Sequence, residues 1–168
     1  MCSSDLSGRS FQCQHPEATL RRPGDAPRLS RHGAALFQGM GLGGFAECAL
    51  IHENQLALVP KDMPFAQAAL LGCGVATGAG AILNTADVHA GDTVVIFGAG
   101  GVGLNAVSGA RIAGASRIVV IDLQPKRLEA AKQFGATDEI DSTKADPVEA
   151  VRALLPRGAD HVDRKSVV

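Results

Sequence analysis

The stretch TVVIFGAGGVG, residues 93–103, decides the fold of this chain. Its first five residues are β-prone throughout, as expected for a strand that is covered on both faces. The next six residues have the glycine spacing G-x-G-x-x-G, and residues 104–113 follow with helical spacing. A chain with 20 glycines can produce this spacing by chance. Its position between a buried strand and a helix is much more specific.

Strand and helix signals continue to alternate toward the carboxyl end. Residues 117–121 predict a second buried strand, and Pro125 begins a helix that Gly135 ends. Weaker patterns predict a strand near 138–140 and a helix over 147–155. This order indicates an α/β architecture, a partial, doubly wound parallel sheet of Rossmann type.

The first third of the chain has a different character. Residues 1–33 show no periodicity, whereas residues 45–51 and 56–59 predict two short strands around a polar turn. A Pro residue in the first turn then predicts the start of a short helix over 65–71.

A second glycine-containing segment follows that short helix. Gly72-Cys73-Gly74 leads into an Ala- and Gly-rich stretch that predicts a helix up to Thr85. The small side chains imply that another element packs closely against this helix.

The loop after the first buried strand has the features of a dinucleotide-binding turn. Its first glycine allows the tight turn, its second lets a pyrophosphate approach the backbone, and its third lets helix and strand pack closely. Free N–H groups at the helix start, together with the helix dipole, favour phosphate charge. An empty structural turn is the alternative. The predicted cofactor-binding residues are Gly98, Ala99, Gly100, Gly101, Val102 and Gly103.

An acidic residue stands at the distance that such a loop requires. Asp122 follows Gly103 by 19 residues, where a carboxylate can accept hydrogen bonds from the adenosine ribose hydroxyls. It also repels a 2′-phosphate, because two charges ~5 Å apart at an effective dielectric of ~20 repel by roughly 3 kcal/mol. That is about two decades of affinity, so the predicted cofactor is NAD. Arg127 lies within reach of the same ribose and can soften this preference. A solvated strand end is the alternative for Asp122.

These motifs together carry a family resemblance. Residues 72–78 read GCGVATG, and with Gly98–Gly103 and Asp122 they resemble the zinc-dependent alcohol dehydrogenases of the medium-chain dehydrogenase/reductase superfamily. The similarity runs from about Cys13 to Val162. It implies that a remnant of an amino-terminal, β-rich, GroES-like catalytic domain precedes the nucleotide-binding domain.

The resemblance also implies roles for single residues. Cys73 matches a ligand of the catalytic zinc, Thr77 matches a residue against the nicotinamide, and Val102 matches one beneath it. Arg127 matches a basic residue that contacts the ribose. Zinc with three protein ligands keeps a fourth place for the substrate oxygen and stabilises a developing alkoxide during hydride transfer. Without the resemblance, Cys73 reads as a small buried residue, and zinc-free reductases also occur in the superfamily.

Cys13 is the candidate for a second metal site. Members of the family often hold a structural zinc through C-x2-C-x2-C-x7-C, and residues 9–13 resemble the stretch before the fourth cysteine. Counting back places the third at Asp5. Cys48 follows a strand signal and reads as core. The histidines lack metal-ligand spacing and read as surface or turn residues; they are His15, His32, His52, His89 and His161.

The overall composition narrows the partners. A net charge of -1 and the absence of Trp and Tyr give no reason to expect nucleic acid or an anionic membrane. No apolar run approaches the ~20 residues of a bilayer span, and the start of the chain lacks a signal-peptide core, so the cytoplasm is the predicted location. The resemblance implies a small alcohol or aldehyde substrate and a homo-oligomer.

Both ends of the chain depart from these patterns. Residues 1–6 and 163–168, written as codons, resemble the two arms of a sequencing adapter and fit neither the family nor the fold. The hypothesis is that residues 7–60 are the GroES-like remnant and residues 61–162 a truncated NAD-binding domain of a longer enzyme. Divergent termini are the alternative.

The function implied by the resemblance is hydride transfer between an alcohol/aldehyde pair and NAD, in a zinc-containing dehydrogenase of which this chain is a fragment. A zinc-independent quinone or enone reductase is the alternative within the superfamily. For the chain as it stands, a non-catalytic nucleotide-binding module is a third interpretation.

Overall fold

The structure, a computed structural model, describes residues 24–25, 29–36, 44–45, 47–49 and 56–164. The chain divides into two compact units, Met1–Pro60 and Lys61–Val168. The described part of the first unit contains one antiparallel pair, β1 (Ser30–Arg31) with β2 (Ala34–Ala35).

The strands expected over 45–51 and 56–59 are wrong for those of their residues that the structure describes. Residues 45, 47–49 and 56–60 have no strand conformation. A strand needs a hydrogen-bonded neighbour as well as β-prone residues, and the described residues provide no such ladder here. Cys48, expected in a core, is exposed.

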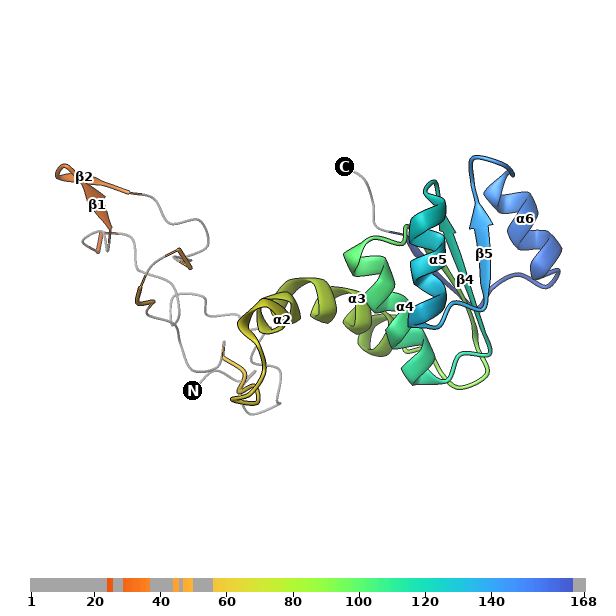
Figure 1. The fold of residues 1–168 in the computed structure, drawn as a ribbon, viewed down its shortest axis with the longest axis horizontal. Coiled ribbons are helices and arrows are strands. Elements are labelled where there is room, and N and C mark those ends of the chain that lie inside the picture. The colour runs from red at the N-terminus through yellow and green to blue at the C-terminus, as the bar shows by residue number, and fades with distance from the viewer. Residues whose placement is uncertain (1–23, 26–28, 37–43, 46, 50–55, 165–168) are drawn as a thin grey trace. The chain divides into compact units, whose positions relative to one another are not determined.

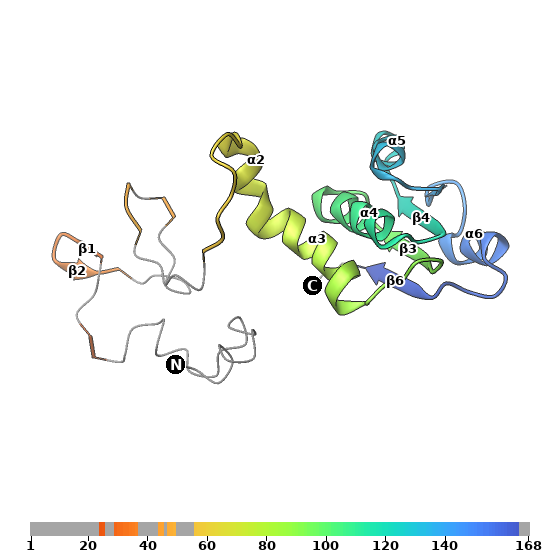
Figure 2. The same ribbon diagram turned by 90° about the horizontal axis from the view of Figure 1, so that it is seen from below.

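The second unit is built on a parallel sheet whose described strands run in the order β5-β4-β3-β6. Figure 2 shows β4, β3 and β6 side by side in this order. Its centre is formed by β3 and β4, in which eight of the eleven residues are buried and the other three are half-buried. The four strands are β3 (Thr93–Phe97), β4 (Arg117–Asp122), β5 (Asp138–Asp141) and β6 (His161–Arg164).

Helices cover both faces of this sheet. Because successive side chains of a strand point to opposite faces, Val94 and Ile96 enter one core and Val95 enters the other. The first core is completed by α4 (Gly101–Ala113) and α5 (Pro125–Phe134), the second by α6 (Pro147–Leu154) (Figure 1). The predicted α/β, doubly wound parallel arrangement is confirmed.

A continuous helical run precedes the sheet. It consists of α2 (Phe65–Leu70), the π-helical η5 (Leu71–Val75), α3 (Ala76–Gly80) and the π-helical η6 (Ala81–Thr85). Gly72-Cys73-Gly74 therefore lies inside a helix and not ahead of one, because a glycine in a helix costs only about 1 kcal/mol and does not end it.

By length and composition this run could also cross a membrane. Phe65–Thr85 has 21 residues, and an 18-residue window of it has a mean hydropathy of 1.5, so the expectation that no apolar run approaches a bilayer span is wrong. A core helix of a soluble domain passes the same test, although here only 11% of the apolar window is buried. The buried part includes Gly78 and Ile82, which face α4.

Strand β6 was not expected from the sequence. Val162 is its one apolar residue, and its side chain is exposed. Asp163 and Arg164, which the sequence pattern left outside the fold, lie opposite Ile96 and Phe97 in the ladder. Strand pairing uses main-chain groups, so a charged edge strand gives no hydrophobic signal.

Candidate functional site

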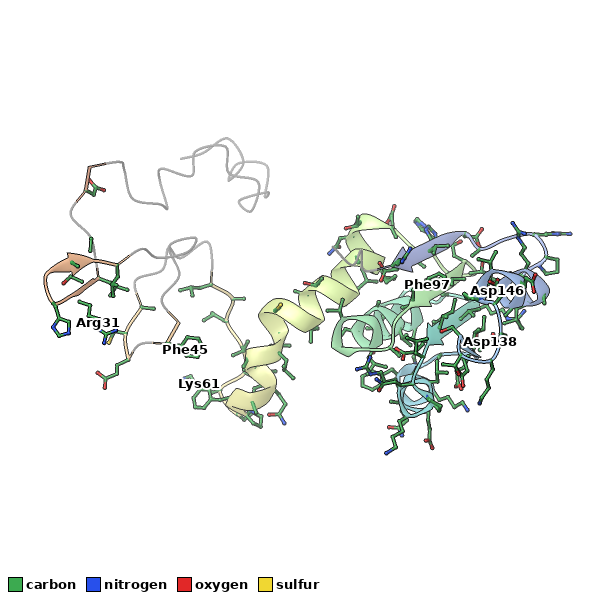
Figure 3. All side chains as sticks on the ribbon, turned by 90° about the horizontal axis from the view of Figure 1, so that it is seen from above. Arg31, Phe45, Lys61, Phe97, Asp138 and Asp146 are labelled. Carbon is green, nitrogen blue, oxygen red and sulfur yellow. The ribbon has the colours of Figure 1, made fainter. Side chains whose placement is uncertain are left out.

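The glycine loop begins where β3 ends, at Phe97 (Figure 3). Gly98 has φ +92°, the left-handed region that favours glycine, and its N–H donates to the Ile121 carbonyl at 2.7 Å. Gly100 then caps α4 with extended backbone, and its carbonyl accepts the Leu104 N–H at 2.8 Å. The strand, turn and helix thus follow one another as the spacing predicted.

The glycines of this loop serve two different purposes. A Cβ on Gly103 would lie 1.8 Å from the Gly98 oxygen, so the turn and the first turn of α4 require a glycine there. A Cβ on Gly100 or Gly101 would meet nothing within 4 Å. These two positions leave open space beside main-chain amides at the positive end of a helix, which is where a phosphate group can approach.

Asp122 connects this loop to the next one. Its Oδ2 accepts the Ala99 N–H at 2.8 Å, and its Oδ1 accepts the Gln124 N–H at 2.8 Å. The residue is 8% exposed, so the alternative of a solvated strand end is wrong. Because each oxygen accepts one main-chain donor, the buried charge is stabilised by hydrogen bonds from two loops.

Arg127 lies on the first turn of α5 beside this carboxylate. Its Nη1 is 3.8 Å from Asp122 Oδ2, which is too long for a hydrogen bond, and its side chain is 50% exposed. Exposed ion pairs of this length contribute little to stability. The guanidinium is therefore available to turn toward another anionic group at the same strand end.

The structure brings the helix of Thr77 against the start of α4. A Cβ on Gly78 would lie 2.2 Å from the Val102 oxygen, so the two helices touch directly at this point. Thr77 is exposed and Val102 is half-buried. The close packing predicted from the small residues is confirmed, and the same pattern continues at Gly109, whose Cβ would lie 3.1 Å from the Ala79 Cα.

Cys73 lies four residues before Thr77, within the π-helical η5. Its side chain is exposed, so the reading of a small buried residue is wrong. Short π-helical segments occur often at functional sites. In the described part of the chain, no group of three His, Cys, Asp or Glu side chains could hold a metal ion. The described residues therefore do not form a zinc site by themselves.

The structure describes only some of the remaining metal candidates. Cys13, His15 and His52 lie outside the described residues. Of the described histidines, His32 and His89 are exposed, as expected. His161 differs: it lies in β6, and its Nε2 is 3.1 Å from Asp92 Oδ2.

The amino-terminal ends of β4 and β5, at the opposite end of the strands from the glycine loop, carry a second set of charged residues. At the start of β4, Arg117 makes two hydrogen bonds of 2.8 Å to Asp138, which is labelled in Figure 3. The Arg117 guanidinium holds the pKa of Asp138 below its ordinary value, and a hydrogen bond from Thr137 adds to this. These carboxylate contacts hold strands together and lie away from the glycine loop. Nothing in the sequence pattern predicted them.

The parallel sheet, the glycine turn and the buried acid at the end of β4 define a Rossmann-type α/β domain. Residues 101–163 match the protein family described as zinc-binding dehydrogenase. The chain is 41% identical to an S-(hydroxymethyl)glutathione dehydrogenase of Photobacterium damsela subsp. piscicida, over 95% of this chain and 45% of that protein. It is 42% identical to an alcohol dehydrogenase class-3 of Myxine glutinosa, over 94% of this chain and 43% of that protein.

Solved structures agree with these relatives. The benzyl alcohol dehydrogenase of Acinetobacter calcoaceticus is 43% identical, with a TM-score of 0.60, and the match covers 62% of this chain and 29% of that one. The chain thus spans less than half of the length of the relatives it matches. These findings confirm the resemblance to zinc-type alcohol dehydrogenases of the medium-chain superfamily.

Proposed function

We propose that this chain carries the NAD-binding part of a zinc-type alcohol dehydrogenase. The observation that supports this most strongly is the open space at Gly100 and Gly101, beside the first turn of the 13-residue α4. The turn itself does not require glycine at these two positions, and their lack of a side chain leaves the main-chain amides at the start of α4 accessible. The open space at Gly100 and Gly101 suits a pyrophosphate group, which needs close approach to main-chain N–H groups.

The neighbouring strand end completes the cofactor site in this proposal. Each Asp122 oxygen has one protein donor and therefore a further lone pair for a ribose hydroxyl. Arg127 assists at the same ribose, and its exposed side chain has room to move. A 2′-phosphate would meet the Asp122 charge, so NAD is bound in preference to NADP.

Thr77 and Val102 line the nicotinamide end of the site in this proposal. Their helices meet at Gly78, which places one side of α3 next to the start of α4. When bound, NAD⁺ would accept a hydride from an alcohol, and NADH would donate a hydride to an aldehyde. The protein residues hold the ring at a fixed place relative to the glycine loop.

We further propose Cys73 as one zinc ligand of the complete enzyme, with Cys13 as a candidate for a structural zinc. The Cys73 thiol is exposed on a π-helical turn, so it is accessible to a zinc ion that other residues also bind. The described residues hold no group of three metal ligands, so in this proposal Cys73 shares the zinc ion with ligands from outside them. Small alcohols or aldehydes as substrates, a cytoplasmic location and a homo-oligomeric state belong to the same proposal.

For the 168-residue chain itself, we propose nucleotide binding without turnover. This second function is favoured by the absence of a three-ligand metal group from the described residues. In the complete enzyme, metal analysis separates the zinc enzyme from a zinc-independent reductase.

Calorimetric titration with NADH and NADPH tests the proposal. We expect NADH to bind with enhanced fluorescence and NADPH to bind about 100-fold more weakly. Simple alcohols with NAD should give no turnover in this chain. Absence of heat with both nucleotides would contradict the nucleotide-binding function, and turnover of an alcohol would contradict the proposal of binding alone.

A further inference from the structure

We propose that Asp122 is a positioning residue that holds the glycine loop in its ligand-ready shape before any cofactor binds. The inference rests on the proposed function for the identity of the ligand. It goes beyond that function because it assigns Asp122 a role toward the protein's own backbone, in addition to its contact with the ribose.

The two carboxylate oxygens of Asp122 accept hydrogen bonds from two different loops. Oδ2 accepts the N–H of Ala99, inside the glycine loop, and Oδ1 accepts the N–H of Gln124, the residue that caps α5. One side chain therefore joins the turn after β3 to the turn after β4. Ala99 is itself 1% exposed, so its N–H has no access to water as a substitute acceptor.

The neighbouring backbone contact fixes the same turn at a second point. The N–H of Gly98 donates to the carbonyl of Ile121, the residue before Asp122. Two successive N–H groups of the loop are thus held by two successive residues of β4. This arrangement sets the direction in which the following residue, Gly100, leaves the sheet.

Asparagine is the informative replacement because it keeps the size of the side chain and removes one acceptor. Its amide has one acceptor oxygen and one donor nitrogen. Asp122→Asn therefore leaves either Ala99 or Gln124 with an N–H that faces another donor. A buried donor without a partner is expensive, so the loop should lose its fixed shape.

A pair of ligands separates the two roles of Asp122. ADP has the ribose hydroxyls, and 2′,3′-dideoxyadenosine diphosphate lacks them while keeping the diphosphate. If Asp122 positions the loop, Asp122→Asn should weaken binding of the dideoxy ligand about tenfold or more, as well as that of ADP. If Asp122 acts only on the sugar hydroxyls, its replacement will leave the affinity for the dideoxy ligand unchanged, and the inference is overturned.

Asp138→Asn is the matched control. Asp138 is also a partly buried, hydrogen-bonded carboxylate of the same sheet. It contacts Arg117 and Thr137 at the amino-terminal ends of the strands, opposite the glycine loop. Its replacement should lower stability without changing the affinity for either ligand. An equal loss of affinity in both variants would show a general effect of destabilisation and would overturn the positioning role.

A ligand-free measurement keeps the inference testable if Asp122→Asn does not fold or if the wild-type chain binds neither ligand. NMR can detect a scalar coupling across the hydrogen bond between the Ala99 nitrogen and the Asp122 carboxyl carbon in the wild-type chain. We expect this coupling, together with slow hydrogen exchange of the Ala99 amide. Its absence with fast exchange would overturn the inference, whereas failure of the wild-type chain to bind ADP would overturn only the proposed function.

Discussion

The glycines of the 98–103 loop and those beside Cys73 look alike in the sequence, but the structure treats them differently. At Gly103 there is no space for a Cβ, and at Gly98 the backbone is left-handed. At Gly72 and Gly74 a Cβ would meet nothing within 4 Å, and no positive φ is recorded. Glycine is thus required by the fold at Gly98 and Gly103 and tolerated by the fold at Gly72 and Gly74, so the presence of a glycine alone does not reveal its purpose.

Gly103→Ala should have the largest effect. The added methyl group would collide with the Gly98 backbone oxygen, which cannot move without opening the turn. We expect a loss of about 3 kcal/mol or more in the free energy of unfolding, at the upper end of overpacking effects. Chemical denaturation measures this, with Gly101→Ala as the control that adds a methyl group into open space. Equal stability of the two variants would contradict the distinction between required and tolerated glycines.

Gly100→Ala should separate folding from binding. Its Cβ meets open space in the ligand-free chain, so the unfolding transition should shift little. The same methyl group would stand where we place the pyrophosphate, and NADH affinity should fall at least tenfold, which corresponds to about 1.4 kcal/mol. Calorimetry compares the variant with wild type. An unchanged NADH affinity would show that the open space at Gly100 is not part of the cofactor site.

Gly74→Ala should have a small effect with the opposite sign. Its position is helical and open, and alanine is favoured over glycine in a helix by about 1 kcal/mol. We expect equal or slightly higher thermal stability and unchanged NADH binding. A marked destabilisation would mean that the segment around Cys73 is as tightly built as the loop.

Cys73→Ser should have the smallest effect of all in this chain. The thiol is exposed, and replacements of exposed residues usually change stability by less than about 0.5 kcal/mol. NADH affinity should also be unchanged, whereas zinc content of the complete enzyme should fall. Loss of NADH binding in the variant would place Cys73 in the cofactor site itself.

The sequence predicted the parts of the fold in which local chemistry and burial agree. The strand at Thr93–Phe97 and the helix Pro125–Phe134, ended by Gly135 with φ +122°, occur where they were expected. Both have strong local signals, in one case a continuous apolar run and in the other a proline start with a glycine stop.

The missed elements depend on partners that local chemistry does not reveal. The strand His161–Arg164 contains one apolar residue, Val162, and forms because β3 offers a free edge to its main chain. Conversely, residues 56–59 are β-prone and form no strand, since the described residues provide no neighbour. The helical run Phe65–Thr85 is likewise continuous where the sequence predicts two helices separated at Gly72-Cys73-Gly74, because two glycines favour a break.

The sequence predicted which residues make up the candidate site but not the hydrogen bonds among them. Glycine spacing between a strand and a helix, with an acid 19 residues further on, predicted Gly98–Gly103 and Asp122 as cofactor-binding residues. It did not show that the carboxylate would be buried and hydrogen-bonded to Ala99, because the sequence does not specify which protein donors face an acid at a strand end.

The crossing of α3 and α4 at Gly78 has a mechanical consequence. Because the two helices are in backbone contact at Gly78, sliding of one past the other would cause a collision, and the pair should move as one rigid unit. Cys73 lies in the helical run that includes α3, and the glycine loop leads into α4. A bulky residue at Gly78 would push α3 and α4 apart. It would thereby change the distance between the Cys73 thiol and the glycine loop.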